Sequence, residues 1–290
     1  MSSTSTPSSS PSSRTSTSRI AARFETLRAT RQCGLVTYVT AGDPDTTQSA
    51  AILQALDRAG ADVLEIGVPF SEPLADGPVI QRASERALAG GMTLPRTLDL
   101  IASVRATLSA PIVLFTYANP VYRLGLDRFT ARASDAGVDG LLVLDLPIEE
   151  AEPLHTAASG ASLDVIWLLS PTTTTERIRR AAEMGSGFLY GISRLGVTGA
   201  RAEVATGARE LAGRIRQETD LPIALGFGLS RPEHIAQVGE WADAAVVGSA
   251  LVDRIAKHTA SNGDPAALAD AVEQYVRWLK GSGPAPVTTP

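Results

Sequence analysis

Cysteine, histidine and lysine are all scarce in this chain of 290 residues. The single cysteine, Cys33, excludes an internal disulfide and is typical of a protein in a reducing compartment. Alone, it is most simply a small apolar side chain of the interior. The only lysines are Lys257 and Lys280, and the histidines are His155, His234 and His258. The chain therefore offers few side chains for a Schiff base or a metal site.

An excess of positive charge and long apolar runs are also lacking. The net charge of -5 and the pI near 5.3 provide no basic field, so we expect no binding to nucleic acid or to an anionic membrane surface. No apolar run reaches the roughly 18 residues that a membrane span needs. A hydrophobic content of 44% nevertheless allows a large core. We expect a cytoplasmic protein.

The two ends of the chain differ in composition from the rest. Residues 1–19 are rich in Ser and Thr and contain no acid or apolar segment, which excludes a secretory signal peptide. An organelle transit peptide is the weaker alternative to a disordered tail, because little there could form an amphipathic helix. We expect residues 20–280 to form a single domain and residues 281–290 to form a second tail.

Eight short apolar segments alternate with helical patterns between these tails. The expected strands are 34–40, 63–66, 111–117, 138–144, 163–169, 187–192, 222–225 and 244–247. The expected helices include a short amphipathic one from Ile20 to Leu27, ahead of the first strand, one marked by Ile52, Leu53 and Leu56, and one that contains Phe129. Further helices are expected at 79–88, 98–108, 150–158, 175–182, 204–217, 232–238, 250–257 and 265–279.

This alternation predicts a (β/α)8 barrel with an extra N-terminal helix. Strands separated by helices must run parallel, and eight such units match the size of this fold. A doubly wound sheet is the rival, but it should carry a glycine-rich dinucleotide turn after the first strand. Thr40-Ala41-Gly42-Asp43 lacks that pattern. In a barrel, catalytic groups are expected at the C-terminal ends of strands.

Two acids, Glu65 and Asp76, occupy such positions. Glu65 interrupts an apolar strand, so a sheet covered on both faces would bury its carboxyl group and raise its pKa. Asp76 follows on a loop stiffened by Pro69, Pro73 and Pro78. Taken singly, Glu65 could be an ion-pair partner and Asp76 part of a helix-entry turn. Together they predict a two-carboxylate acid/base site.

Glycine-containing segments follow the last three expected strands. They are residues 196–199, 225–230 and 247–250. Barrels commonly bind a phosphate after strands seven and eight, where backbone N–H groups and a helix N-terminus face the anion. Gly248 and Ser249, which open the helix at Ala250, fit this pattern and predict a phosphate site.

Apolar and aromatic strand ends lie between the acids and the glycines in the expected fold. They are Tyr38, Phe115, Tyr117, Leu142, Leu168 and Tyr190. Any one of them could be barrel core. Collectively they predict a substrate with a flat apolar part at one end and a phosphate at the other.

The sequence resembles the tryptophan synthase α-chain family from about Arg23 to Lys257. The segments that carry the resemblance are LEIGVPFS (64–71), LADGP (74–78), SRLGVTG (193–199), GFG (226–228) and GSA (248–250). The resemblance implies a lyase that cleaves indole-3-glycerol phosphate to indole and glyceraldehyde 3-phosphate in tryptophan biosynthesis. It also implies an α2β2 complex, with pyridoxal phosphate held by the β chain and no cofactor in this chain.

The resemblance also assigns residue roles. Glu65 becomes the general acid/base, Asp76 the partner of the indole N–H, and Tyr190 a side chain lining the site. Thr198 and Gly199 fall on a loop that closes over substrate. The implied phosphate ligands are Gly199, Gly228, Gly248 and Ser249.

Two positions depart from the family pattern. Glu72 replaces the usual Asp on a loop that the family uses to contact the β chain, which affects the details of that contact. Tyr38 replaces a usual Phe, and its hydroxyl group then needs a hydrogen-bond partner.

An aldol-type cleavage without a lysine or a metal requires another electron sink. Protonation of indole C3 makes the ring iminium-like, and removal of the side-chain hydroxyl proton then breaks the carbon–carbon bond. Glu65 and Asp76 supply the acid/base group and the charge-balancing group for this route. A stand-alone lyase that releases free indole is the alternative function. A non-catalytic activating barrel is disfavoured because both acids are present.

Overall fold

The computed structural model describes residues 18–192, 203–226, 228–261 and 264–286. The expected N-terminal tail lies almost entirely outside the described residues, as do the last four residues of the chain. No helix within the described ranges is long and apolar enough to cross a membrane.

Nine parallel strands in the described part of the chain form the barrel. They are β1 (Gly34–Thr40), β2 (Val63–Gly67), β3 (Ile112–Thr116), β4 (Gly140–Val143), β5 (Asp164–Val165), β6 (Trp167–Leu169), β7 (Leu189–Ile192), β8 (Ile223–Gly226) and β9 (Ala244–Val247). Their order is β5-β4-β3-β2-β1-β9-β8-β7-β6. The two edge strands β5 and β6 are separated only by Ile166, whose N–H donates to Leu141 O at 2.8 Å. The predicted barrel is therefore confirmed, with its fifth strand divided in two.

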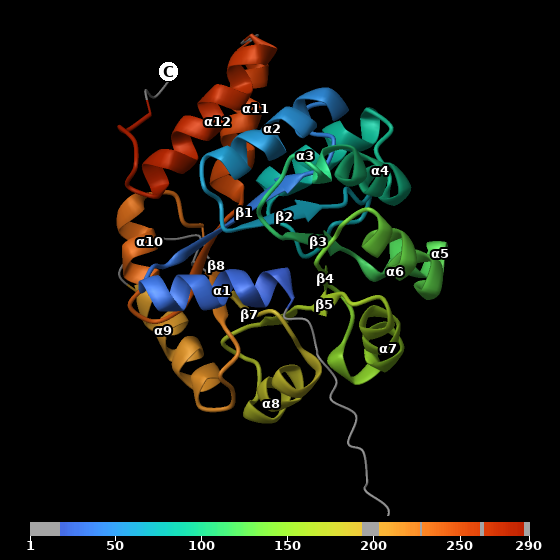
Figure 1. Cartoon of the computed structure of the whole chain (residues 1–290), viewed down its shortest axis with the longest axis vertical. Helices are drawn as coiled ribbons and strands as arrows, with labels where there is room; N and C mark the ends of the chain where they lie inside the picture. Colours follow the sequence, from blue (N-terminus) through green and yellow to red (C-terminus); the bar gives the residue numbers. More distant parts are fainter. Residues whose placement is uncertain (1–17, 193–202, 227, 262–263, 287–290) are drawn as a thin grey trace, which may run out of the picture.

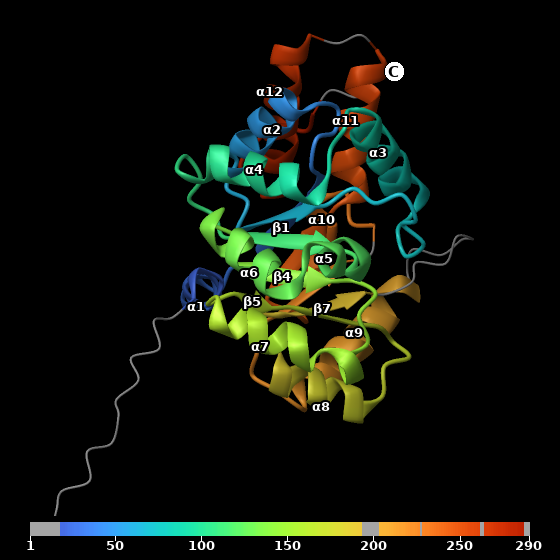
Figure 2. The same cartoon turned by 90° about the vertical axis from the view of Figure 1, so that its right-hand side faces the viewer.

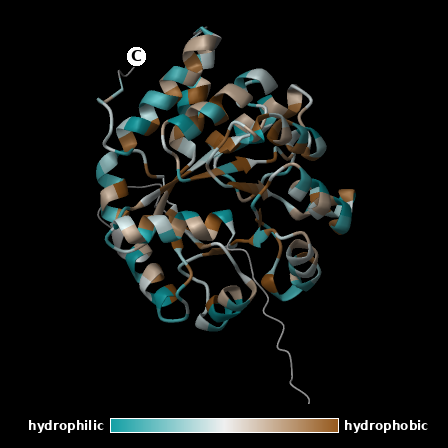
Figure 3. Ribbon diagram, viewed as in Figure 1, coloured by the Kyte–Doolittle hydropathy of each residue, from teal (hydrophilic) through white to brown (hydrophobic). Residues whose placement is uncertain are grey.

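Helices surround the strands (Figure 1). They are α1 (Arg19–Thr30), α2 (Thr46–Arg58), α3 (Pro78–Ala89), α4 (Leu94–Arg105), α5 (Ala118–Leu124), α6 (Leu126–Asp135), the 3-10 turn η1 (Ile148–Glu150), α7 (Glu152–Gly160), α8 (Thr175–Met184), α9 (Glu203–Arg216), α10 (Pro232–Val238), α11 (Ser249–Ala260) and α12 (Pro265–Leu279). The colours of Figure 3 place hydrophobic residues along the central strands and hydrophilic ones on the outer faces of the helices.

Two helices differ from their predicted bounds for local reasons. The predicted helix 98–108 begins earlier, at Leu94, because the Thr93 side chain caps it and Pro95 is tolerated in a first turn. The helix around Phe129 is preceded by a separate one, α5. Gly125 divides the two with φ at +88°, a conformation that few other residues adopt.

Alternate residues of each strand point into the barrel, as the pleat requires. Val36, Val63, Val113, Leu142, Ile166, Phe188, Ala224, Ala244 and Val246 pack there with Ile20, Phe24 and Leu27 of α1. The Phe24 and Phe188 ring centroids lie 5.4 Å apart. Helix α1 therefore closes one end of the barrel with its apolar face, and Figure 2 shows it at that end.

Ion pairs attach α1 to aspartates that begin the strands. Arg23 binds Asp62 and Arg28 binds Asp243, with Nε–oxygen distances of 2.9 and 3.0 Å. Asp62 is 1% exposed and also accepts from Leu35 N and Lys280 Nζ, each at 2.7 Å. One carboxylate thus connects α1, β1, β2 and the C-terminal end of the last helix.

Removing this carboxylate should destabilise the barrel. Asp62→Ala leaves the guanidinium of Arg23, the ammonium of Lys280 and the amide of Leu35 without their shared acceptor. We expect a loss of about 3 kcal/mol in the free energy of unfolding, measured by urea titration. The control is Asp99→Ala, because the Asp99 side chain is 69% exposed and, among the described residues, forms an ion pair with Arg132 alone. It should lose less than about 1 kcal/mol. Equal losses in the two variants would contradict this account of α1.

Candidate active site

Glu65 lies in the middle of β2 and points into the barrel. Its register partners are Tyr38 of β1 and Val113 of β3. The residue is 1% exposed, and its Oε1 is buried without a hydrogen-bond partner among the described residues. Burial, with a smaller contribution from the charge of Asp76, raises the pKa of the Glu65 carboxyl from 4.5 to about 8. The group is therefore protonated at neutral pH and is able to donate a proton.

Asp76 lies on the loop between β2 and α3. Burial raises the pKa of its carboxyl from 3.8 to about 6, and a hydrogen bond from the Tyr117 hydroxyl opposes that rise. The Tyr117 Oη donates to Asp76 Oδ2 at 3.0 Å. Between about pH 6 and pH 8 the site therefore combines an ionised Asp76 with a protonated Glu65. This is the pairing of acid and base roles that two carboxyl groups with separated pKa values provide.

Tyr38 and Tyr190 lie within electrostatic reach of both acids, and Phe115 packs against Tyr38. Tyr38 and Phe115 pack edge to face, with ring centroids 5.3 Å apart. Burial, followed by the charge of a nearby carboxylate, raises the pKa of Tyr38 and of Tyr190 well above the usual value. For Tyr190 the carboxylate is that of Glu65, so this ring lies in the electrostatic reach of the acid. Both phenols consequently stay neutral.

Glycines make room for these tyrosines. A Cβ on Gly67 would lie 2.1 Å from the Tyr38 hydroxyl, and one on Gly226 would lie 2.7 Å from the Tyr190 hydroxyl. The Tyr38 hydroxyl, which the family pattern lacks, lies 3.5 Å from Thr40 Oγ1, at the limit of a hydrogen bond. Its partner is thus found within its own strand, two residues further on.

Leu142 and Leu168 differ in position although both were predicted to line the site. Leu142 is 0% exposed and packs in the barrel interior. Leu168 is partly exposed and lies opposite Tyr190 in the register of β6 and β7. Leu144, two residues beyond Leu142 on the same face, is also partly exposed and was not predicted. The alternation of side chains along β4 could have predicted that Leu144 shares the face of Leu142.

The predicted phosphate ligands are only partly described. Gly248 is the N-cap of α11 and Ser249 is the first residue of that helix, whose leading N–H groups have no intrahelical acceptor. Gly228 follows β8 with φ at +70°. Thr198 and Gly199 lie outside the described residues, as does the loop to which they belong.

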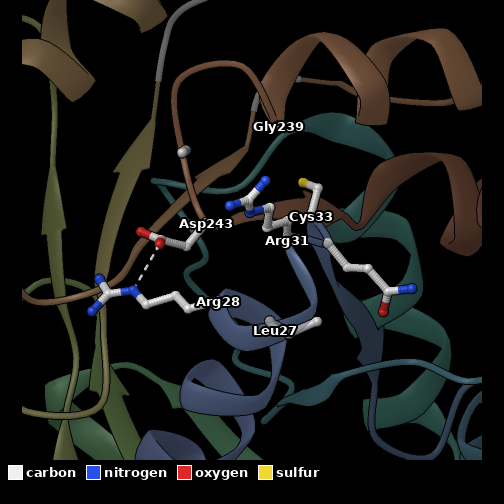
Figure 4. Close-up of a pocket in the computed structure, with 8 residues that line it drawn as sticks. Leu27, Arg28, Arg31, Cys33, Gly239 and Asp243 are labelled. Atoms are coloured by element: carbon white, nitrogen blue, oxygen red, sulfur yellow. Dashed lines mark hydrogen bonds and ion pairs between the residues drawn. The ribbon is translucent and has the colours of Figure 1, made fainter.

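A cavity of about 220 Å³ lies elsewhere, against α1 and the start of β1 (Figure 4). Its lining residues are Leu27, Arg28, Arg31, Gln32, Cys33, Gly239, Ala242 and Asp243. None of them belongs to the predicted site. Burial raises the pKa of the Cys33 thiol to about 12, so the thiolate needed for nucleophilic chemistry is absent at neutral pH.

The fold and the paired carboxyl groups define an acid/base enzyme built on a (β/α)8 barrel. Comparison with known proteins narrows this class. A family model described as the tryptophan synthase alpha chain matches residues 24–280. The alpha chain of Picosynechococcus is 47% identical over 262 residues, which cover 90% of this chain and 97% of the relative. That of Geotalea uraniireducens is 50% identical over 235 residues, covering 81% and 88%.

Comparison with solved structures points to the same family. Tryptophan synthase subunit alpha from Legionella pneumophila superposes with a TM-score of 0.84 at 36% identity, covering 91% of this chain and 98% of that one. The chain therefore belongs to the tryptophan synthase α-chain family. It is a carbon–carbon lyase of tryptophan biosynthesis, and its reaction is the cleavage of indole-3-glycerol phosphate.

The raised pKa of Glu65 makes the stability of the protein depend on pH. Below pH 4.5 the carboxyl is protonated in both the folded and the unfolded chain. Between pH 4.5 and about 8 only the unfolded chain loses the proton, so the free energy of unfolding falls by up to about 1.4 kcal/mol per pH unit. Glu65→Gln lacks this loss because an amide cannot ionise.

We therefore expect the stability difference between Glu65→Gln and the parent chain to shift in favour of the variant as pH rises from 4.5 to 8. It should become constant above pH 8. Urea titrations across this range measure the difference. Two curves that run parallel throughout would show that Glu65 ionises normally in the folded state.

Proposed function

We propose that Glu65 is the acid/base residue of the cleavage and that Asp76 binds the indole N–H. The observation that carries this proposal is the buried Glu65 carboxyl, which is 1% exposed, protonated at neutral pH and within electrostatic reach of Asp76, and whose Oε1 has no hydrogen-bond partner among the described residues. Such a carboxyl has little structural value, since an unsatisfied buried polar group destabilises the fold. It has the properties of a general acid.

The proposed reaction uses one proton twice. Glu65 donates its proton to indole C3, which converts the ring into an iminium-like electron acceptor. The resulting Glu65 carboxylate takes the proton of the side-chain hydroxyl, the bond between C3 and that carbon breaks, and its electrons return to the ring. Indole and glyceraldehyde 3-phosphate leave, and Glu65 is protonated again. Asp76 carries the negative charge that stabilises the ring nitrogen while it is positive.

The remaining predicted residues hold the two ends of the substrate in this proposal. The indole ring lies among Tyr38, Phe115, Tyr117, Leu168 and Tyr190, and the buried Leu142 supports this pocket from the barrel interior. The phosphate is bound by Gly199, Gly228, Gly248 and Ser249, with Thr198 on the loop above it. The positive end of α11 and its unpaired N–H groups support the placement at Gly248 and Ser249.

The chain works with the tryptophan synthase β chain, as members of its family do, in an α2β2 complex. The pyridoxal phosphate of the complete enzyme belongs to that β chain, and this chain carries no cofactor. Residues 20–280 act as one catalytic domain with a tail at each end, and the enzyme works in the cytoplasm.

Replacing either acid should abolish most of the activity without unfolding the chain. Glu65→Gln keeps the side-chain shape but cannot transfer a proton, so turnover of indole-3-glycerol phosphate should fall by roughly 100-fold or more. Asp76→Asn should also lose most turnover, because it cannot balance the ring charge. Steady-state indole release by purified chain measures both.

Glu150→Gln is the matched control, since Glu150 is an exposed residue of η1. It should keep parental activity. If Glu65→Gln retained near-normal indole release, the proposed proton transfer would be refuted.

A further inference from the structure

The loop that carries Asp76 is stabilised mainly by its own contacts. Leu74 N donates to Glu72 O at 2.9 Å, and Asp76 N donates to Pro73 O at 3.0 Å. The Gln81 side chain, on α3, donates to Asp76 O at 2.9 Å. These bonds fix the shape of the loop. They do not fix the position of the loop over the barrel, because the donor and the acceptor of each bond belong to the loop or to the helix that follows it.

Tyr117 supplies the connection from the loop to the rest of the barrel. Its hydroxyl donates to Asp76 Oδ2 at 3.0 Å and accepts from Ala75 N at 3.3 Å. Its ring packs against Phe70 with centroids 5.0 Å apart. Among the described contacts, no other side chain outside this loop and α3 forms a hydrogen bond with residues 71–77.

Tyr117 is itself held in place. It follows β3 directly and is 4% exposed. The next residue, Ala118, donates its N–H to Asp145 Oδ1 at 2.7 Å, which ties the start of α5 to the end of β4. Burial and the charge of Asp76 raise the pKa of the Tyr117 phenol far above its usual range, so its hydroxyl remains a donor at every pH at which the enzyme works.

We infer that Tyr117 is the positioning residue of Asp76 and is more than a wall of the substrate pocket. The inference rests on the proposed role of Asp76. By donating to Oδ2, the hydroxyl selects one orientation of the carboxylate and leaves Oδ1 for the indole N–H. By accepting from Ala75 N, the same oxygen holds the backbone beside Asp76. A displacement of about 1 Å at such a group can cost roughly 100-fold in rate.

This arrangement also sets the pH at which Asp76 ionises. The titratable groups that face it are Glu65 of β2, Tyr38 of β1, Tyr190 of β7 and Tyr117 after β3. The two tyrosines other than Tyr117 stay neutral, and Glu65 is protonated below about pH 8. Among the described residues, the Tyr117 hydroxyl supplies the one hydrogen bond that lowers the pKa of Asp76, so loss of this donor should raise that pKa above about 6.

The test is Tyr117→Phe, which keeps the ring against Phe70 and removes only the hydroxyl. We expect kcat/KM for indole-3-glycerol phosphate to fall by about tenfold, mostly through kcat, because Asp76 acts on charge that develops in the transition state. The acidic limb of the pH profile should move to higher pH, while the alkaline limb, set by Glu65, stays in place. Tyr122→Phe is the control: Tyr122 lies on α5, is 50% exposed, and should leave both limbs unchanged.

Tyr117→Phe in an Asp76→Asn background separates this inference from the proposed function. If Asp76→Asn loses most of the activity and the second substitution lowers the residual rate no further, the two residues act as one unit. If Asp76→Asn is inactive but Tyr117→Phe keeps the parental rate and acidic limb, the inference is overturned and the role of Asp76 survives. If Asp76→Asn is fully active, the proposed function itself is wrong.

Discussion

An uncompensated carboxyl group inside the barrel is the constraint on which the site depends. Glu65 is 1% exposed, and its Oε1 has no partner in the described structure. A carboxylate in that environment would be strongly destabilising, so the group keeps its proton at neutral pH. The fold holds it there: β2 is paired on both sides, and α1 closes the far end of the barrel with apolar side chains. Burial therefore gives the lyase a carboxyl group that is protonated near neutrality, as the proposed general acid must be.

The pKa of the second acid, Asp76, is raised less than that of Glu65, and this difference suits Asp76 to a different role. Asp76 is partly exposed on a loop and receives a hydrogen bond from Tyr117, so its pKa rises only to about 6. Glu65 lies on a strand that is paired on both sides, whereas Asp76 lies on a loop that Tyr117 connects to the barrel. Glu72 lies on the exposed part of the same loop, and its carbonyl oxygen accepts from Leu74 N.

Much of this could be predicted from the sequence, because it follows from local patterns. Alternation of apolar segments with helices predicted the barrel, and β9 and α10 match their predicted bounds. Position within β2 was enough to predict that Glu65 is buried. Contacts between residues distant in the sequence could not be predicted from local patterns. The Tyr117 hydroxyl donates to Asp76, 41 residues away in the sequence, and the ion pairs of α1 involve residues as far apart as Arg28 and Asp243. The partial exposure of Leu144 depends on where β4 ends in the barrel, which local sequence patterns do not determine.

The most direct measurement of the central claim is a titration of the Glu65 carboxyl itself. Glutamate labelled with ¹³C at the side-chain carboxyl can be followed by NMR across pH 4 to 10, with Glu65→Gln used to assign the signal. The account predicts an apparent pKa near 8 for Glu65, well above the ordinary 4.5. A Glu65 signal that titrates near 4.5 would contradict it, because Glu65 would then be an ordinary carboxylate with no proton to give at neutral pH.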